Sequence, residues 1–241
     1  MRRSLSSVGL KPLLLLVAIS AGAALAVWGG IDKAFSALFY VPGAGFPLWH
    51  SPLGTGLRLS TSVAGYGISI FLLFALLWRV LLGRPIMGLR RAAVLYLIAV
   101  FAIGPGLIVN GILKAESGRA RPAATVEFGG NKRYTPPLAI SDQCERNCSF
   151  VSGEASLGFA FLAFGFAATT RARRRLGFAA GLAFGVAFGL LRIAQGGHFL
   201  SDVYFAGVLM LALAWLLEKL LLAHGGLDRL GWWPAEPEPG R

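Results

Sequence analysis

Charged side chains are scarce in this chain. Only 14% of its 241 residues are charged, whereas a soluble domain carries about 25%. The chain is 56% hydrophobic and its mean hydropathy is +0.66, so it has too few polar side chains to cover a water-soluble surface. We therefore expect an integral membrane protein with an all-α fold, built as a bundle of about six transmembrane helices.

Acidic residues are scarcer than basic ones. The chain has 11 Asp and Glu against 23 Lys and Arg, which gives a formal net charge of +12. Nucleic-acid binding often explains such an excess. Here many of the basic residues lie in short connections between apolar stretches, where they orient the stretches across a membrane. Nucleic acid is therefore not an expected partner.

Cysteine is almost absent. The two cysteines, Cys144 and Cys148, lie close together in one polar connection. A structural zinc site needs four ligands and no other soft ligand is nearby, so we expect no metal there. In an oxidising compartment the pair fits a disulfide, because one turn of chain brings the two Cα atoms within bonding range.

Six apolar stretches are long enough to cross a membrane, since about 20 helical residues span a hydrocarbon core roughly 30 Å thick. They cover residues 12–29, 60–82, 92–113, 152–170, 176–193 and 202–222. Residues 1–26 also fit a signal peptide, but the apolar run continues to Trp28, which favours a retained helix. We expect one domain over residues 1–241, with its core at residues 92–222 and a short cytoplasmic tail at residues 225–241.

The basic residues predict the orientation of these spans. Four basic groups fall on one side if six spans alternate, and the positive-inside rule makes that side cytoplasmic. Residues 30–59, 114–151 and 194–201 then lie on the outer face of a bacterial inner membrane. The 114–151 connection carries six basic residues on this unfavoured side, which indicates a role in binding: Lys114, Arg119, Arg121, Lys132, Arg133 and Arg146.

His198 and Asp202 lie four residues apart, so one helical face presents both. An aspartate at this spacing can accept the Nδ1 proton of the imidazole and leave Nε2 as a nucleophile or base. A lone membrane histidine is more often a core residue, but an ionisable pair inside a span favours a functional site. Arg192, six residues earlier, fits either a snorkelling side chain or a bidentate phosphate ligand.

Basic side chains also gather at the end of the third stretch. Lys114 is followed by Arg119 and Arg121, and the turn at Ser117-Gly118 allows all three to point to one anion. A phosphate dianion fits three such cations better than a carboxylate does. An ordinary interfacial basic segment is the alternative interpretation.

The fourth stretch opens with Ser152, Gly153 and Glu154. Serine is a favoured N-cap, and the free N–H groups of a helix N-terminus bind anions. An ordinary cap explains the first two residues equally well. Glu154 in the first turn fits the helix dipole, so it too has a structural explanation.

These clusters together resemble the type 2 phosphatidic acid phosphatase superfamily. Its motifs read Lys, six residues, Arg-Pro; then Pro-Ser-Gly-His; then Ser-Arg, five residues, His, three residues, Asp. In this sequence the corresponding residues, over about residues 110–205, are Lys114, Arg121-Pro122, Val151-Ser152-Gly153-Glu154, Leu191-Arg192, His198 and Asp202. Three spaced motifs in the right order are far more specific than any one of them.

The resemblance implies a metal-independent lipid phosphatase that needs no cofactor. His198 would attack phosphorus and form a phosphohistidine, and Asp202 would orient it. Phosphate oxygens would be bound by the remaining motif residues: Lys114, Arg121, Arg192, and the Ser152 and Gly153 backbone. Arg119 is not part of the motif, and we expect it to bind substrate because it belongs to the same basic cluster.

Glu154 is the main departure from the family pattern, because it replaces the histidine that protonates the leaving group. Three explanations remain open. Glu154 is the acid itself, if burial keeps its carboxyl protonated; or the leaving group, such as a phosphate, needs little protonation. In the third, Glu154 stays ionised and either pairs with Lys or Arg or activates the water that hydrolyses phosphohistidine. Val151 for proline and Leu191 for serine are milder changes.

The expected substrate is an amphiphile with several anionic charges, since a site at the outer membrane surface meets lipid headgroups. Lipid A, undecaprenyl diphosphate and phosphatidylglycerol phosphate fit this description, and the composition favours the first two. Aromatic residues between positions 31 and 50 fit an interfacial anchor better than a substrate gate. The rival functions are a lipid phosphotransferase, a non-catalytic lipid-phosphate binder or transporter, and a membrane scaffold. No obligate protein partner is expected.

Overall fold

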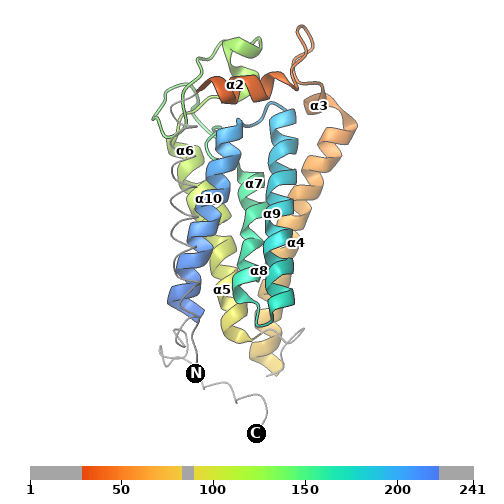
Figure 1. Cartoon of the computed structure of the whole chain (residues 1–241), viewed down its shortest axis with the longest axis vertical. Helices are drawn as coiled ribbons and strands as arrows, with labels where there is room; N and C mark the ends of the chain where they lie inside the picture. The colour runs from red at the N-terminus through yellow and green to blue at the C-terminus, as the bar shows by residue number, and fades with distance from the viewer. Residues whose placement is uncertain (1–28, 83–89, 223–241) are drawn as a thin grey trace.

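The structure is a computed structural model that describes residues 29–82 and 90–222. Its long helices run side by side along the long axis of the molecule (Figure 1). Within the described residues the regular elements are all helical, apart from two isolated β-bridges. The predicted all-α fold is confirmed.

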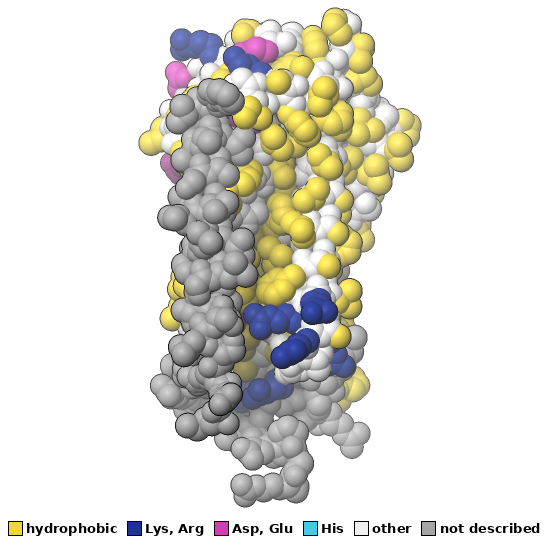
Figure 2. Space-filling view, in the orientation of Figure 1, with side chains coloured by type: hydrophobic (Ala, Val, Ile, Leu, Met, Phe, Trp, Pro, Cys, Tyr) yellow, Lys and Arg dark blue, Asp and Glu magenta, His cyan; other side chains and the backbone are white. Residues whose placement is uncertain are grey.

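Within residues 29–82 and 90–222, four helices are long and apolar enough to cross a membrane. They are Pro52–Leu82, Arg91–Glu116, Arg171–Ala194 and Leu200–Leu222. The first is α4 and the third is α9, while the second comprises α5 (Arg91–Phe101), η2 (Ala102–Leu113) and α6 (Lys114–Glu116), and the fourth comprises α10 (Leu200–Leu217) and η5 (Glu218–Leu222). In the view of Figure 2, hydrophobic side chains cover the middle of the bundle, and charged side chains gather toward its two ends.

The predicted span at residues 152–170 is shorter than expected. It forms α7 (Gly153–Ala160) and α8 (Leu162–Ala167), and together these make an apolar helix of fewer than 18 residues. The helix begins where the Ser152 side chain accepts the Ala155 N–H, and it ends where the backbone becomes extended at Ala168. The predicted span at residues 12–29 lies outside the described residues, except for Gly29.

Glycines place α9 directly against α7 and α8. Four of them recur at every fourth position on one face of α9 and are buried: Gly177, Gly181, Gly185 and Gly189. A Cβ on Gly181 would lie 2.3 Å from the backbone nitrogen of Leu162. Small residues in membrane helices allow such close backbone packing, and here it fixes the start of α7 beside the end of α9.

The third predicted span changes its helical form at Ala102, three residues before Pro105. Proline lacks the backbone N–H that an α-helix needs, and η2 is a π-helix that contains this residue. The Asn110 side chain donates to the Pro105 carbonyl at 2.7 Å. Lys114 therefore follows directly after the π-helical segment, and its side chain lies next to the start of α7.

Short elements cover one end of the bundle (Figure 1). They are α2 (Gly29–Ala37), α3 (Pro47–His50), η3 (Pro122–Ala124) and η4 (Val126–Phe128). Phe46, Phe128 and Phe199 form a buried cluster among these elements, with Tyr40, Trp49 and other aromatic residues against it. The aromatic residues between positions 31 and 50 thus help to pack this end of the protein onto the segment that carries His198.

Candidate active site

His198 lies between the end of α9 and the start of α10, and it is fully buried. Its Nδ1 atom is 2.7 Å from the carbonyl oxygen of Ser149. Because a carbonyl only accepts, Nδ1 carries the proton and donates it. The lone pair of His198 is then on Nε2, which has no hydrogen-bond partner among the described residues.

Asp202 was expected to accept the Nδ1 proton, and the structure corrects this. Its nearer carboxylate oxygen is 3.8 Å from Nδ1, too far for a hydrogen bond. That oxygen instead accepts from the Ser149 hydroxyl at 2.6 Å and from the Phe199 N–H at 2.8 Å. Asp202 therefore acts on His198 through Ser149, whose hydroxyl contacts the carboxylate while its carbonyl contacts the imidazole.

Arg119 is placed differently from the expected phosphate ligand. Its guanidinium is buried and forms ion pairs with Asp32 and Asp202. Burial lowers the pKa of Arg119, but the carboxylates of Asp202 and Asp32 outweigh this effect and raise the pKa overall. Its Nε also donates to the Thr135 carbonyl at 2.8 Å. A guanidinium bound to two carboxylates supports Asp202 instead of facing a substrate with Lys114 and Arg121.

Glu154 lies between Arg192 and His198. Its Oε1 is 3.1 Å from Arg192 Nε, and its Oε2 is 3.6 Å from His198 Nε2. Arg192 Nε and Glu154 Oε2 are buried, and neither is aligned for a hydrogen bond within the described residues. Glu154 thus connects two further buried polar atoms that have no hydrogen-bond partner among the described residues, Arg192 Nε and His198 Nε2. Of the three atoms only Arg192 Nε is a donor, whereas Glu154 Oε2 and the lone pair of His198 Nε2 are acceptors. Such a group is suited to a polar ligand that both donates and accepts hydrogen bonds, such as water.

Arg192 is held by Gln195 at the end of its own helix and by Trp49 on α3. Its Nη1 donates to Gln195 Oε1 at 2.6 Å, and Gln195 Nε2 donates to the Gly54 carbonyl on α4 at 2.8 Å. Its Cζ lies 5.3 Å from the centroid of the Trp49 ring, within cation–π range. The guanidinium is therefore fixed beside Glu154, and it does not reach out to lipid headgroups.

Lys114 reaches the start of α7 from the end of η2. A Cβ on Gly153 would lie 2.8 Å from Lys114 Nζ and 3.1 Å from Asn110 Oδ1, so only glycine permits this approach. Ser152 is the N-cap of α7, as its sequence position predicted. The Ser152 hydroxyl accepts the Ala155 N–H. The N–H groups before it, in the first turn of α7, have no intrahelical acceptor, and they lie close to the lysine ammonium.

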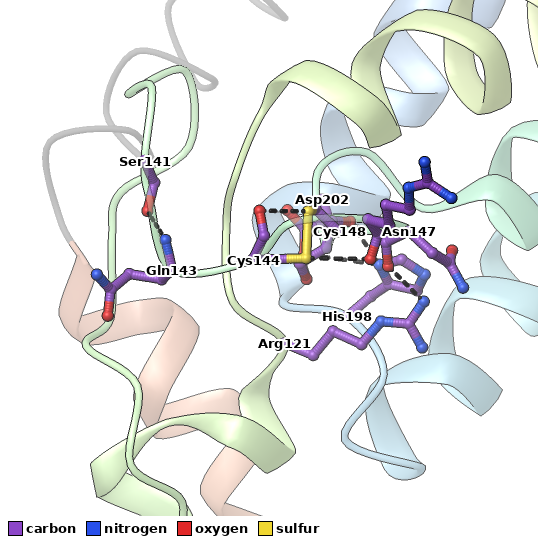
Figure 3. Close-up of a disulfide and its surroundings, with 10 residues drawn as sticks. Arg121, Ser141, Gln143, Cys144, Asn147, Cys148, His198 and Asp202 are labelled. Carbon is purple, nitrogen blue, oxygen red and sulfur yellow. Dashed lines mark hydrogen bonds and ion pairs between the residues drawn. A yellow bond between two sulfur atoms is a disulfide. The ribbon is translucent and has the colours of Figure 1, made fainter.

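Arg121 is positioned by the loop that contains the cysteines. Cys144 and Cys148 form a disulfide with Cα atoms 5.6 Å apart. The carbonyl of Asn147, inside that loop, accepts from Arg121 Nη2 at 2.8 Å. Figure 3 shows the Arg121 guanidinium pointing to Asn147. The disulfide lies on the other side of Asn147, and His198 and Asp202 lie nearby.

Arg58 on α4 is a cation that the sequence motifs do not identify. Arg58 precedes the third motif, which begins at Leu191, by more than 130 residues. In the structure its Cζ is nevertheless 6.0 Å from the centroid of the same Trp49 ring that Arg192 contacts. Burial lowers the pKa of Arg121, Glu154 opposes this effect, and Arg58 lowers the pKa further. Arg58 therefore adds positive potential to the site. No local pattern marked it, because an arginine at a helix start is common near a membrane surface.

A cavity of about 300 Å³ adjoins these residues. Lys114, Gly153 and Glu154 line one part of it, and further lining residues come from α4, from α5 and η2, and from α7. On α4 it extends from Thr61 to Ser69, which is about 12 Å of helix. Within the described ranges, no group of three His, Cys, Asp or Glu side chains could hold a metal ion.

Three curated relatives, each named lipid A 4'-phosphatase, match part of the chain. The protein of Francisella tularensis subsp. novicida is 42% identical over 131 residues, which cover 54% of this chain and 59% of that protein. The proteins of Rhizobium leguminosarum and Rhizobium etli are 37% and 36% identical, each over 50% of this chain and over 48% and 44% of their own lengths. The chain thus spans about half the length of these relatives. No solved structure matches the chain significantly.

The sequence model of the PAP2 superfamily matches residues 93–224, which is more than half of the chain. This range includes His198, Glu154, Lys114 and the other motif residues, and it excludes Arg58 and Asp32. The chain therefore belongs to the PAP2 superfamily.

Proposed function

We propose that this protein removes a phosphate group from a membrane lipid and that His198 is the nucleophile. One observation carries the proposal. The Ser149 carbonyl fixes the proton on His198 Nδ1, and Nε2 faces buried polar atoms of Glu154 and Arg192. An imidazole whose Nε2 lone pair has no hydrogen-bond partner among the described residues, with Glu154 beside it and Arg192 paired to Glu154, is suited to attack phosphorus.

In the first step, Nε2 of His198 attacks the phosphorus atom. A bond forms between nitrogen and phosphorus, and the bond from phosphorus to the lipid oxygen breaks. The lipid oxygen takes up a proton from water and leaves as a hydroxyl, and the hydroxide that remains is neutralised by the proton released when water hydrolyses the phosphohistidine. Lys114, Arg121 and Arg192 supply the positive charge that stabilises the equatorial oxygens in the transition state.

In the second step, water attacks the phosphohistidine. The nitrogen–phosphorus bond breaks, inorganic phosphate leaves, and the imidazole returns to its neutral form. The phosphorylated ring keeps its Nδ1 proton and is therefore cationic. The Ser149 carbonyl and the Asp202 carboxylate behind it stabilise this charge through the contacts described above.

Glu154 acts in this scheme as a carboxylate. Its ion pair with Arg192 favours the ionised form, which supports the third of the explanations drawn from the sequence. A carboxylate 3.6 Å from Nε2 is placed to accept a proton from the water that attacks phosphohistidine. In the free protein it occupies the position beside Arg192 to which a phosphate oxygen would bind.

The role of Glu154 is testable by two substitutions. Glu154→Gln removes the base but keeps the size of the side chain, and it is expected to lower kcat by about 100-fold or more. Glu154→His introduces the residue of the family motif and is expected to retain more activity than Gln. Steady-state phosphate release from lipid measures both. If Glu154→Gln turns over at the wild-type rate, Glu154 is neither an acid nor a base.

The substrate class we propose is lipid A, a lipid with a phosphorylated sugar headgroup. The names of the three relatives support it, as does the presence of Arg58 beyond the three motif cations. The charges of a headgroup with more than one phosphate would be matched by this additional guanidinium.

The function is tested with purified full-length protein in detergent micelles that contain lipid A. Release of inorganic phosphate by the wild type, and its loss in His198→Ala, are the expected results. Phosphate that appears on a second lipid instead of in solution would indicate a phosphotransferase. No release by the wild type, together with unchanged lipid binding by His198→Ala, would indicate a binder or transporter.

A further inference from the structure

Asp32 lies outside the family match, yet its carboxylate is among the most extensively hydrogen-bonded in the described structure. It is on α2 and only 1% exposed. Its Oδ2 accepts from Arg119 Nη2 at 2.7 Å, from the Tyr134 hydroxyl at 3.0 Å and from the Ser201 hydroxyl at 2.5 Å. Its Oδ1 accepts from the Ser201 N–H at 2.8 Å. A buried carboxylate with this many donors is a built part of the fold.

Arg119 connects Asp32 to the residues around His198. One terminal nitrogen, Nη2, donates to Asp32, and the other, Nη1, donates to Asp202. Asp202 accepts from Ser149, and Ser149 accepts from the imidazole. The path from α2 to the nucleophile therefore consists of four consecutive polar contacts, and every residue on it is buried.

The charges along this path do not cancel. Arg119 contributes one positive charge, and Asp32 and Asp202 each contribute a negative one, so the group has a net charge of −1. With Asp202 and Arg119 alone the pair would be neutral. A phosphohistidine that keeps its Nδ1 proton is cationic, and a buried negative charge nearby stabilises it more strongly than it would in water.

Asp32 also fixes the start of α10. Phe199 precedes this helix and has no polar side chain to cap it. The Asp32 carboxylate accepts the N–H of Ser201 in the first turn, as an N-cap side chain would. Burial raises the pKa of Tyr134, and Asp32 raises it further, so the tyrosine hydroxyl remains a donor to the carboxylate. Asp202, in the same first turn of α10, is thereby held in place.

We propose that Asp32 is a positioning residue for His198. By sharing Arg119 with Asp202 and by capping α10, it leaves one negative charge behind the nucleophile and holds Ser149 and the imidazole in their observed arrangement. The proposal rests on the proposed phosphatase function, and it extends the catalytic apparatus to a helix that precedes the family match.

Asp32→Asn is the direct test, because it removes the charge and keeps the shape. In purified full-length protein we expect kcat for lipid A hydrolysis to fall by about 10- to 100-fold. Substitution of residues that orient a reactive side chain through hydrogen bonds typically has an effect of this size. KM and the inhibition constant of inorganic phosphate are expected to change less than about threefold, because Asp32 does not touch the substrate. Asp32→Glu retains the charge and is expected to recover part of the loss.

Glu127→Gln is the matched control. Glu127 is also a carboxylate bonded to α2, where it pairs with Lys33 at 3.3 Å, but it is partly exposed and has no contact with Arg119 or Asp202. The kcat of the Glu127→Gln variant is expected to equal that of the wild type. Tyr134→Phe is a milder variant, because it removes one donor to Asp32 and keeps all buried charges paired. It is expected to lower kcat several-fold, and it serves as the test if Asp32→Asn does not fold.

A second measurement does not depend on turnover. The chain has three histidines, His50, His198 and His224, so His50→Gln with His224→Gln leaves a single imidazole for ¹⁵N-histidine NMR. This background is expected to show one neutral tautomer with the proton on Nδ1. Asp32→Asn or Tyr134→Phe is expected to produce a mixture of both tautomers, and Glu127→Gln is not.

The outcomes separate this proposal from the function on which it rests. If the wild type releases no phosphate but Asp32→Asn alters the tautomer, the phosphatase function fails and the positioning role stands. If the wild type is active and Asp32→Asn and Tyr134→Phe leave both kcat and the tautomer unchanged, the positioning role is overturned. A large rise in KM at unchanged kcat also overturns it, because that result indicates substrate binding.

Discussion

Arg58 and Arg192 share an aromatic neighbour, Trp49, although they come from different long helices. Arg192 is buried and paired with Glu154, whereas Arg58 is exposed. Two guanidinium groups near one aromatic ring give the site a positive charge that Glu154 only partly neutralises. Arg58 is thus suited to bind a substrate group beyond the phosphate that reacts.

Arg58→Ala is expected to raise KM for a doubly phosphorylated lipid A about 3- to 10-fold and to leave kcat within about twofold, because an exposed charge contributes modestly to binding. A lipid with a single phosphate should be affected less. Steady-state kinetics on both lipids measure the difference. Arg171→Ala removes an exposed arginine at the opposite end of α9 and is the control. An equal KM change in the control, or a loss confined to kcat, would contradict the prediction.

At this scale the sequence predicted motif residues that the structure brings to one end of the bundle, but not all of their partners. Lys114, Arg121, Arg192 and His198 followed from motif spacing, because that spacing reflects where helix ends meet. The Ser149 carbonyl did not, since a backbone acceptor leaves no residue-type signal. Asp32 did not because 166 positions separate it from His198 and only the folded chain brings them near.

Among the elements, the disulfide loop bears most directly on the site. The Asn147 carbonyl that accepts from Arg121 belongs to the loop closed by Cys144 and Cys148. The loop is further attached to the bundle, because the Cys148 N–H donates to the Lys114 carbonyl at 3.1 Å. The disulfide thus restrains a segment that contacts two of the motif cations.

Reduction of the disulfide is expected to lower kcat/KM about 10-fold, since small displacements of a positioning group are costly in catalysis. Activity before and after dithiothreitol treatment measures the effect. The double variant Cys144→Ser with Cys148→Ser should have the same low activity with and without the reductant. If the wild type and the double variant are equally active and both ignore dithiothreitol, the loop does not position Arg121.

The elements themselves were predicted well where apolar length defined them. The predicted stretch at residues 60–82 begins eight residues late, because the first turns of α4 contain polar and small residues that an apolar run does not include. The short α7–α8 helix was predicted as a full span, since its terminating Ala168 has no sequence signal. The π-helical form of η2 depends on how Pro105 is accommodated in the bundle, which spacing alone does not show.

On the scale of the whole molecule, the site lies at one end of the bundle and the basic start of α9 lies at the other. Arg171, Arg173, Arg174 and Arg175 begin α9, and Arg192 ends it at the site. The positive-inside rule therefore favours a site on the outer face of the membrane. Such a location gives the site access to lipids of the outer leaflet.

Cysteine labelling tests this orientation in spheroplasts of the expressing bacterium. In a Cys144→Ser, Cys148→Ser background, Ile140→Cys places a thiol at a position that is 91% exposed near the site. It is expected to react with a membrane-impermeant maleimide in intact spheroplasts. Arg171→Cys, at the other end, should react only after lysis. The reverse pattern would place the site in the cytoplasm.

The most direct test of the mechanism is to trap the covalent intermediate. Full-length protein is mixed with lipid A labelled with ³²P at its phosphates, quenched within milliseconds in alkali, and digested for peptide mapping. We predict label that is stable in alkali and labile in acid, on the peptide that contains His198, and none in His198→Ala. Rapid phosphate release by His198→Ala, or label on any other residue, would contradict the account.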